Sequence, residues 1–301
     1  MERQSARTTG ILFTLGAFLV WGFVPPYWHL LSAVPALQIP AHRIVWTCLF
    51  LAVLISLRRG WGAVGAALSS RRTVLTLILT AVLVTTNWTL FIVGVLQNRL
   101  VEVSMGYFIN PLVSVLLGVV VLRERLGRLQ WIAVALALAG VLFQAVSERV
   151  VPWTPLGLAL SFGLYGLFRK TVNVDSTTGT FLETLFLLPL TLAYLGGEAA
   201  RGVGAFGTEG FSTDLFLVLA GVVTGVPLIW FAAGARLIPL SLVGFIQYLT
   251  PTLHLLFGVV VYGEAFTRND AIGFGMIWLA IGLYIGSTTL HARRRVPVPA
   301  Q

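Results

Sequence analysis

Two apolar stretches of the chain each carry a row of polar side chains and a proline at helical spacing. The first row is Tyr107, Pro111 and Ser114, and the second row is Gln247, Pro251 and His254. Residues three or four positions apart lie on one face of a helix, and Asn110 and Tyr248 adjoin these faces. Polar groups within a membrane are costly unless they are paired or wetted. The rows therefore predict a substrate cavity between two helices, with hydrogen bonds between helices as the alternative for Asn110 and Gln247.

The prolines of the two rows fall in the middle of their apolar stretches. A proline inside a helix removes one backbone hydrogen bond and bends the helix. It also leaves a carbonyl group without its usual partner, which at membrane depth needs another donor or a water-lined cavity. Pro111 and Pro251 are therefore predicted to line the cavity and to act as gating points, with static bends that aid packing as the alternative.

Three titratable side chains are candidates for coupling to protons or to charge on a solute. His254 titrates near neutral pH, so it could relay a proton or bind solute, or it could be a neutral histidine with its hydrogen bonds satisfied. Glu183 stands inside an apolar stretch, where it could carry a proton or lie near the membrane rim. Arg43 could attract an anionic group such as a carboxylate, or it could extend its side chain to the membrane surface.

Aromatic and amide side chains in other apolar stretches could complete an amphipathic pocket. The candidates are Trp21, Asn87, Trp88 and Tyr165. Tryptophan and tyrosine also form belts at membrane surfaces and pack between helices, which is the alternative for each of them. Asn87 and Trp88 lie deep in their stretch, which favours the cavity for these two residues.

The composition identifies the surroundings of these groups as lipid. The chain has 301 residues, of which 57% are hydrophobic and 10% are charged, and its mean hydropathy is +0.91. Soluble domains carry roughly 25% charged residues, so a soluble fold could not cover its surface with so few. The net charge of +9 sits at the edges of apolar runs, which is typical of membrane topology and argues against a nucleic-acid partner.

Apolar runs long enough for spanning helices recur along the chain, since a bilayer core needs about 20 helical residues. The predicted spans are Gly10–Leu31, Ile39–Leu57, Thr73–Leu96, Val103–Leu122, Leu129–Ser147, Pro155–Phe168, Thr178–Tyr194, Leu215–Leu237, Leu240–Tyr262 and Ala271–Leu290. These runs are apolar on every side, whereas barrel strands would alternate. The predicted fold class is therefore an all-α integral membrane protein with ten transmembrane helices.

The two halves of the chain resemble each other at a shift of 140 residues. The matched positions include Phe91 with Phe231, Gly94 with Gly234, Pro111 with Pro251, Gly118 with Gly258 and Glu124 with Glu264. We expect a first repeat over residues 10–147, a second over residues 150–290, and a basic cytoplasmic tail over residues 291–301. Five helices per repeat place the second half in the membrane upside down, which is an inverted-topology repeat of the kind that secondary transporters use.

The distribution of basic residues predicts that both termini are cytoplasmic. With that orientation, 15 of the 20 basic residues lie inside: Arg3, Arg7, Arg58, Arg59, Arg71, Arg72, Arg123, Arg125, Arg128, Arg169, Lys170, Arg236 and Arg293 to Arg295. The glycine-rich segment from Gly196 to Asp214 is predicted to be a mobile outer loop. Small residues in the fifth span, namely Ala133, Ala137, Ala139 and Gly140, would permit close helix contact and suggest a homodimer interface.

Several short segments resemble a known family of permeases. The segments are Gly106 to Leu112 (GYFINPL), Ala41 to Trp46 (AHRIVW), Asn87-Trp88, Leu187 to Leu190 (LLPL) and Tyr262 to Glu264 (YGE). They resemble the RarD group of EamA-type permeases, and the resemblance covers the chain from about Gly10 to Leu290. It implies the drug/metabolite transporter superfamily, ten helices as two EamA repeats, a bacterial inner-membrane location, and transport of amino acids, metabolites or drugs, often outward.

The sequence therefore predicts a secondary transporter. A membrane-embedded enzyme is the least favoured alternative, since the expected site residues lack clustered acids and histidines. No phosphate-binding G-x-x-x-x-G-K-[ST] motif is present, and the four histidines lie in separate segments without metal-ligand spacing. We expect a small amphipathic solute, the lipid bilayer and, in one version, protons as partners, with no cofactor and no metal. A channel or a structural membrane protein is the alternative.

Overall fold

A computed structural model describes residues 2–96, 100–148, 153–261 and 267–294 of the chain, and these residues form helices joined by short connections. The helices in chain order are α1 (Glu2–Phe23), α2 (Pro25–His29), α3 (Gln38–Leu57), α4 (Trp61–Leu68), α5 (Arg71–Leu96), α6 (Leu100–Val120), α7 (Arg128–Glu148), α8 (Trp153–Thr171), α9 (Ser176–Ala200), α10 (Phe211–Leu237), α11 (Leu240–Gln247), α12 (Leu249–Leu256), the π-helical turn η1 (Phe257–Val261) and α13 (Arg268–Arg294). The all-helical fold class is confirmed within these residues.

Seven helical spans within the described residues are long and apolar enough to cross a membrane, by length and composition. They correspond to α1, α3, α5, α7, α9, α10 and the succession of α11, α12 and η1. Shorter apolar helices cover Gly106–Val120 in α6 and Ala271–Ser287 in α13. The remaining long helix, α8, ends in Arg169 and Lys170 and is largely buried in the bundle. Multiple membrane crossings are thus supported, and the count of ten stays a prediction.

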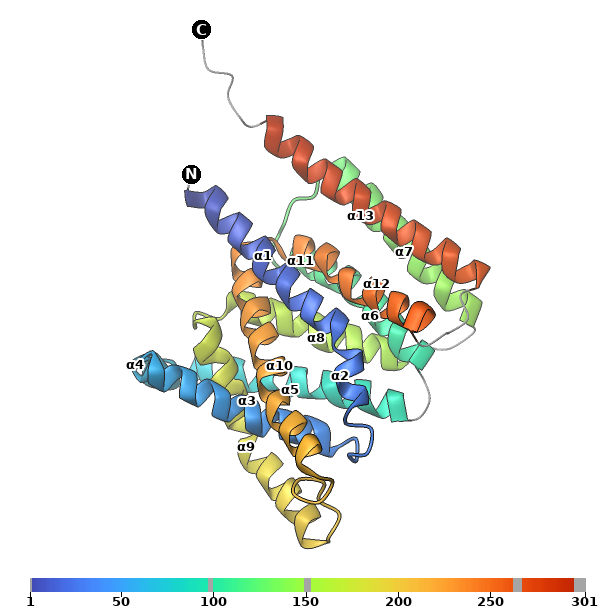
Figure 1. Cartoon of the computed structure of the whole chain (residues 1–301). Helices are drawn as coiled ribbons and strands as arrows, with labels where there is room; N and C mark the ends of the chain where they lie inside the picture. Colours follow the sequence, from blue (N-terminus) through green and yellow to red (C-terminus); the bar gives the residue numbers. More distant parts are fainter. Residues whose placement is uncertain (1, 97–99, 149–152, 262–266, 295–301) are drawn as a thin grey trace.

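The helices pack in a bundle with one pair set at its edge (Figure 1). Helix α6 packs against α8 and α11, α3 packs against α9 and α10, and α1 packs against α10 and α12. Helices α7 and α13 lie side by side at the edge of the bundle, and α1 begins on the same side of the bundle on which α13 ends (Figure 1). Buried aromatic rings, including Phe18, Phe162 and Phe231, form the core among α1, α8 and α10.

The first predicted span, Gly10–Leu31, is wrong as a single helix. Helix α1 ends at Phe23, and the short α2 begins with Pro25 and Pro26. Prolines have no backbone N–H group, so Pro25 and Pro26 cannot continue the hydrogen bonding of α1 and instead begin a new helix, where their geometry is favourable. The carbonyl groups of Trp21 and Gly22, four residues earlier, therefore lose their usual helical partners.

The ninth predicted span is broken in the middle. Helix α11 ends at Gln247 and α12 begins at Leu249, so the break at Tyr248 precedes Pro251 by one turn. Pro251 lacks the N–H that would bond the carbonyl of Gln247, which explains the position of the break. Pro111, by contrast, lies inside the continuous helix α6. The start of α11 is secured by Glu124, whose carboxylate accepts hydrogen bonds from the backbone N–H groups of Leu240 (2.6 Å) and Ser241 (3.0 Å).

The segment between α9 and α10 is not the free loop that its glycines suggested. Helix α9 continues to Ala200, and the side chain of Gln38 in α3 binds the loop through the Val203 carbonyl and the Ala205 N–H, at 2.8 and 2.9 Å. Phe206 packs against the rings of His42 and Trp46. The loop therefore covers the N-terminal end of α3 through long-range contacts that glycine content does not report, and its mobility stays a prediction.

The small residues of α7 serve packing within the chain. Ala133 and Ala137 are fully buried, and a side chain added at Gly140 would meet the Gly273 carbonyl oxygen at 3.0 Å. These positions hold α7 against α13, so they are not free to form the homodimer interface that their composition suggested; Ala139 alone of the four is exposed. The predicted Tyr262–Glu264 motif and residues 295–301 of the predicted tail lie outside the described residues.

Candidate functional site

Arg43 lies over two indole rings near the N-terminal end of α3. Its guanidinium carbon lies 4.7 Å from the ring centre of Trp28 and 4.4 Å from that of Trp88. Its Nε atom donates a hydrogen bond of 2.9 Å to the hydroxyl of Thr224 in α10. The side chain is only 8% exposed. Helices α2, α3, α5 and α10 thus fix the position of one buried cation through two cation–π contacts and one hydrogen bond.

No carboxylate neutralises this cation within the described residues. The titratable groups that act on it are the phenols of Tyr107 and Tyr27. Burial raises the pKa of Tyr27 to about 12, and the nearby positive charge of Arg43 acts in the opposite direction. The Tyr27 hydroxyl is therefore neutral at physiological pH, and it donates a hydrogen bond to the carbonyl of Phe216. Arg43 keeps an uncompensated positive charge in a largely dehydrated position, which is costly in the absence of a ligand.

Tyr107 connects this cation to His254. The rings of Tyr107 and His254 meet edge to face, with centres 5.8 Å apart. The Nε2 atom of His254 lies 3.1 Å from the carbonyl oxygen of Trp21. A carbonyl only accepts, so Nε2 carries the hydrogen. His254 thus supplies the donor that Pro25 denies to this carbonyl, which gives the histidine a structural role beside its predicted one.

Three buried polar atoms lie without hydrogen-bond partners around the break between α11 and α12. They are Oδ1 of Asn110, Oε1 of Gln247 and the hydroxyl of Tyr248. Asn110 is 1% exposed, Gln247 is 4% exposed and Tyr248 is 1% exposed. Nearly all buried polar groups in proteins are paired, so each such atom requires an explanation. These three were predicted cavity residues, and they provide two acceptors and one hydroxyl toward the middle of the bundle.

Helices α6 and α11 approach closely beside these atoms. A side chain added at Gly244 would lie 2.6 Å from the Pro111 carbonyl oxygen and 3.2 Å from the Cβ atom of Ser114. Ser114 is itself 3% exposed. The first row therefore lies against α11 at Gly244, one turn before Gln247, and Tyr107 of the same row meets His254 of the second row.

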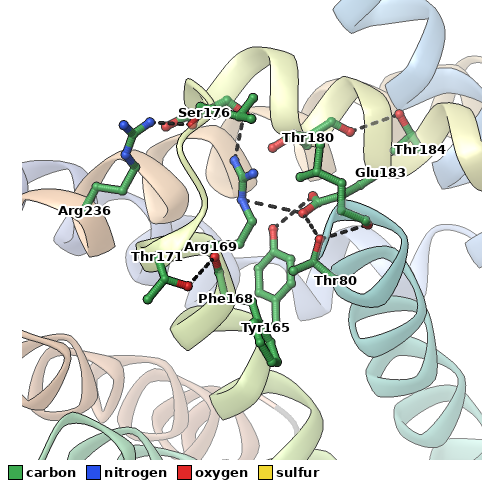
Figure 2. Close-up of polar contacts among 12 residues, drawn as sticks. Thr80, Tyr165, Phe168, Arg169, Thr171, Ser176, Thr180, Glu183, Thr184 and Arg236 are labelled. Atoms are coloured by element: carbon green, nitrogen blue, oxygen red, sulfur yellow. Dashed lines mark hydrogen bonds and ion pairs between the residues drawn. The ribbon is translucent and has the colours of Figure 1, made fainter. Parts of the chain in front are cut away.

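Glu183 belongs to a separate buried cluster with Arg169 (Figure 2). Its carboxylate accepts hydrogen bonds from Thr80 (2.6 Å) and Tyr165 (3.3 Å), and one of its oxygens lies 3.6 Å from the Nε atom of Arg169. Both charged side chains are buried, and Arg169 also reaches the Ser176 carbonyl at 3.2 Å. The guanidinium fits only because residue 179 is glycine, since a Cβ atom there would lie 2.0 Å from Nη1.

The other predicted residues have packing roles in this structure. Asn87 donates from Nδ2 to the Leu158 carbonyl (2.9 Å) and to the Ser161 hydroxyl (3.2 Å), which ties α5 to α8. Trp21 and Tyr165 both pack against Phe231 in the aromatic core. These contacts favour the interhelical role that was the alternative for each residue.

Sequence reasoning missed the partners of the two buried arginines. Trp28 and Thr224 hold Arg43, and Thr80 binds the partner of Arg169. Arg169 was counted among the cytoplasmic loop residues, but it is fully buried within α8. Its neighbour Lys170 binds the Ala235 carbonyl at 2.8 Å. In the sequence, Arg169 and Lys170 together resemble the basic end of a membrane helix. An acidic residue inside an apolar run, here Glu183, was the signal that a buried cation should be sought.

Comparisons with known proteins agree with this architecture. The sequence pattern of the EamA-like transporter family matches twice, over residues 8–145 and 153–286. The chain is 45% identical to an "Uncharacterized transporter" of Vibrio cholerae over 98% of both chains, and 42% identical to "Protein RarD" of Salmonella typhimurium over 98% of this chain and 100% of that one. A "Chloramphenicol-sensitive protein RarD" of Pseudomonas aeruginosa is 37% identical and covers 90% of this chain and 92% of that one.

A solved structure titled "Crystal structure of protein" shares the fold. Its TM-score is 0.70 at 21% identity, and the match covers 96% of this chain and 99% of that one. The helices, the buried polar groups and the family match together define a multi-pass membrane transporter. The chain belongs to the EamA-like transporter family, within the drug/metabolite transporter superfamily, and it is a RarD homologue. Transporters of this kind move solutes and are not enzymes.

Proposed function

We propose that this chain is a secondary transporter that carries a small amphipathic solute across the bacterial inner membrane by alternating access. The observation that carries the proposal is that the contacts of first-half helices with the second half are matched by contacts of the equivalent second-half helices with the first half. The proposal includes ten spanning helices, two inverted five-helix repeats over residues 10–147 and 150–290, and cytoplasmic termini. The basic residues concentrated on one side of the predicted topology support that orientation.

The helix pairs exchange partners between the two halves. Helices α5 and α10 begin 140 residues apart, at Arg71 and Phe211, and α6 and α11 do so at Leu100 and Leu240. The pairs α1–α10 and α1–α12 correspond to α8–α5 and α8–α6, and the pair α3–α10 corresponds to α9–α5. A pseudo-two-fold axis in the membrane plane would relate such pairs. It would let the two halves swap conformations to open the site on alternate sides.

One matched contact shows the correspondence at the level of side chains. A Cβ atom added at Gly22 in α1 would lie 2.4 Å from Leu253 in α12, and one added at Gly163 in α8 would lie 2.6 Å from Val113 in α6. Positions 113 and 253 are 140 residues apart, and positions 22 and 163 are 141 apart. Each half thus uses a glycine to bring its first helix against the fourth spanning segment of the other half.

The unpaired atoms of Asn110, Gln247 and Tyr248 support a polar solute site at the break in the ninth span. An amphipathic solute such as an amino acid, a related metabolite or a drug-like compound could satisfy them when the close contact of α6 and α11 opens. Pro111 and Pro251 flank this contact and are the proposed gating points. The proposed direction of transport is outward, as the sequence resemblance implies.

Proton coupling is assigned to His254 in preference to Glu183. Glu183 has a fixed cationic partner in Arg169, 3.6 Å away, and accepts hydrogen bonds from Thr80 and Tyr165, so it is committed to contacts within the protein. His254 touches both Tyr107 and the Trp21 carbonyl, so a change in its protonation would act on α1, α6 and α12 together. His254→Gln keeps an N–H donor and cannot titrate, so it should retain counterflow and lose the dependence of net uptake on a pH gradient.

Counterflow in liposomes tests the function. Liposomes that contain the purified protein are loaded with one unlabelled compound from a panel of amino acids and amphipathic drugs. Uptake of the same compound in labelled form is then followed. Saturable counterflow that is lost in Asn110→Ala and Gln247→Ala would support the proposal. Leu116→Ala is the matched control, because Leu116 lies on α6 and is 59% exposed to the lipid side. Flux that rises linearly with concentration would instead favour a channel, and flux unchanged in both variants would move the site elsewhere.

A further inference from the structure

We infer that Arg43 binds the carboxylate of the transported solute, so that the substrate class is a small monocarboxylate with an apolar body. This inference rests on the proposed transport function and specifies its ligand. It starts from the contrast between the two buried arginines. Arg169 lies 3.6 Å from the carboxylate of Glu183, whereas Arg43 has no carboxylate partner among the described residues.

The hydrogen-bonding capacity of Arg43 is only partly used. Its Nε atom is bound to Thr224, and no hydrogen bond from either Nη atom to another described residue is found. A guanidinium has five N–H donors, and the bond from Nε to Thr224 accounts for one of them. The Nη donors of Arg43 can therefore bind an acceptor that comes from outside the protein.

The planar guanidinium group of Arg43 favours one kind of acceptor. The ring centres of Trp28 and Trp88 lie 4.7 and 4.4 Å from its central carbon, so indole rings occupy part of its surroundings. An edge of a guanidinium group offers two parallel N–H groups, which match the two oxygens of a carboxylate. The two rings and Thr224 hold the group in place before a ligand binds, so little conformational freedom is lost in a bidentate contact.

The charge and the surroundings narrow the class further. One uncompensated cation balances one negative charge, and the neighbouring groups are the neutral phenols of Tyr27 and Tyr107 and the two indole rings. A phosphate dianion would bring a second negative charge, and no second cation lies among these neighbours of Arg43 to balance it. An apolar body would contact the aromatic rings, and Tyr107 leads along α6 to Asn110, one turn deeper.

A binding assay that does not depend on transport tests the inference. Acids are compared with their neutral amides, namely leucine with leucinamide, phenylalanine with phenylalaninamide and hexanoate with hexanamide, by intrinsic tryptophan fluorescence of the protein in detergent. We expect that at least one acid binds, that its amide binds more weakly by about tenfold to a hundredfold, and that Arg43→Gln removes the preference. Arg43→Lys keeps the charge without the planar fork and should recover binding only in part.

Matched variants locate the signal and guard against misfolding. Trp88→Phe should remove much of the fluorescence change, whereas Trp61→Phe should not, because Trp61 is 47% exposed on α4. Thr224→Val leaves the Nη edge intact and should still prefer the acid. If Arg43→Gln fails to fold, Arg43→Lys tests the same point, because a weaker preference for the acid supports the site and an unchanged preference contradicts it. Trp88→Phe still shows whether the fluorescence signal arises beside Arg43.

The outcomes separate this inference from the transport proposal. Three results would overturn the carboxylate site. They are equal binding of acids and amides, no binding of any acid, and full displacement of the bound acid by chloride at about 0.1 M, near physiological ionic strength. Saturable counterflow of neutral compounds in Arg43→Gln would do the same while leaving the transporter intact. Acid-selective binding without counterflow of any compound would support the site and overturn the transport proposal.

Discussion

Replacing Arg169 alone should destabilise the protein much more than replacing Arg169 and Glu183 together. The two charges are 3.6 Å apart, and their side chains are 0% and 3% exposed. With an effective dielectric constant of about 20, Coulomb's law gives an attraction of about 5 kcal/mol at this distance. Desolvation offsets part of that attraction, and removing one partner of a buried pair typically costs about 3–5 kcal/mol, because the other charge stays buried without a partner.

The double replacement Arg169→Met/Glu183→Gln removes both charges. A glutamine at position 183 can still accept a hydrogen bond from Thr80, which now lies 2.6 Å from the carboxylate. Neutral replacements of buried ion pairs are often close to neutral in stability. We therefore expect the double variant to lie within about 1–2 kcal/mol of the unaltered protein, and the coupling energy of the cycle to be about 3 kcal/mol.

The assay is the free energy of unfolding in mixed micelles titrated with sodium dodecyl sulfate, followed by tryptophan fluorescence. Arg169→Met, Glu183→Gln and the double variant form a double-mutant cycle. A loss below about 1 kcal/mol in Arg169→Met, or a double variant whose loss equals the sum of the single losses, would refute the view that this buried pair secures α8 to α9.

Two further predictions use the same unfolding assay. Gly221→Ala should lower the free energy of unfolding by about 1–3 kcal/mol, because the new Cβ atom would lie 2.4 Å from the backbone carbonyl carbon of Trp46. The control is Gly282→Ala, whose Cβ atom meets nothing within 4 Å and should raise the free energy of unfolding by about 0.5–1 kcal/mol. Equal effects of the two replacements would contradict the close contact of α3 with α10. Arg43→Gln should unfold at the same or a higher free energy than the unaltered protein, because it removes a buried charge that has no partner, and a loss like that of Arg169→Met would show that Arg43 has a structural partner.

The positions of most helices could be predicted from the sequence because hydropathy decides them. The predicted span Ile39–Leu57 differs from α3 by one residue at its start, since lipid favours apolar side chains on every face of such a run. The span Gly10–Leu31 failed at Val24, because hydropathy stays high past this residue while the proline pair ends the backbone hydrogen bonding. Composition therefore predicts which residues lie in the membrane better than it predicts where a helix breaks.

The site could be predicted only as a set of residue types. Helical spacing selected Asn110, Gln247 and Tyr248, each of which has a buried polar atom without a hydrogen-bond partner, and their role as one site stays a prediction. It could not predict that Thr224, 181 residues further along the chain, holds Arg43, nor that Arg169 is buried. Both facts depend on how helices from the two halves pack, and periodicity within one helix carries no information about that packing.

The contrast between the two arginines shows how a buried charge can be assigned a role. A charge with a fixed counter-charge, such as Arg169 with Glu183, contributes to the stability of one packing arrangement. A charge held by aromatic faces and one hydroxyl, such as Arg43, is positioned without being neutralised. If an anion binds there, as we propose, it offsets the free-energy cost of the buried charge, so the empty site would be the less stable state. In a carrier this difference favours conformations that close around an anionic solute, because the ligand removes a penalty that the empty protein must bear.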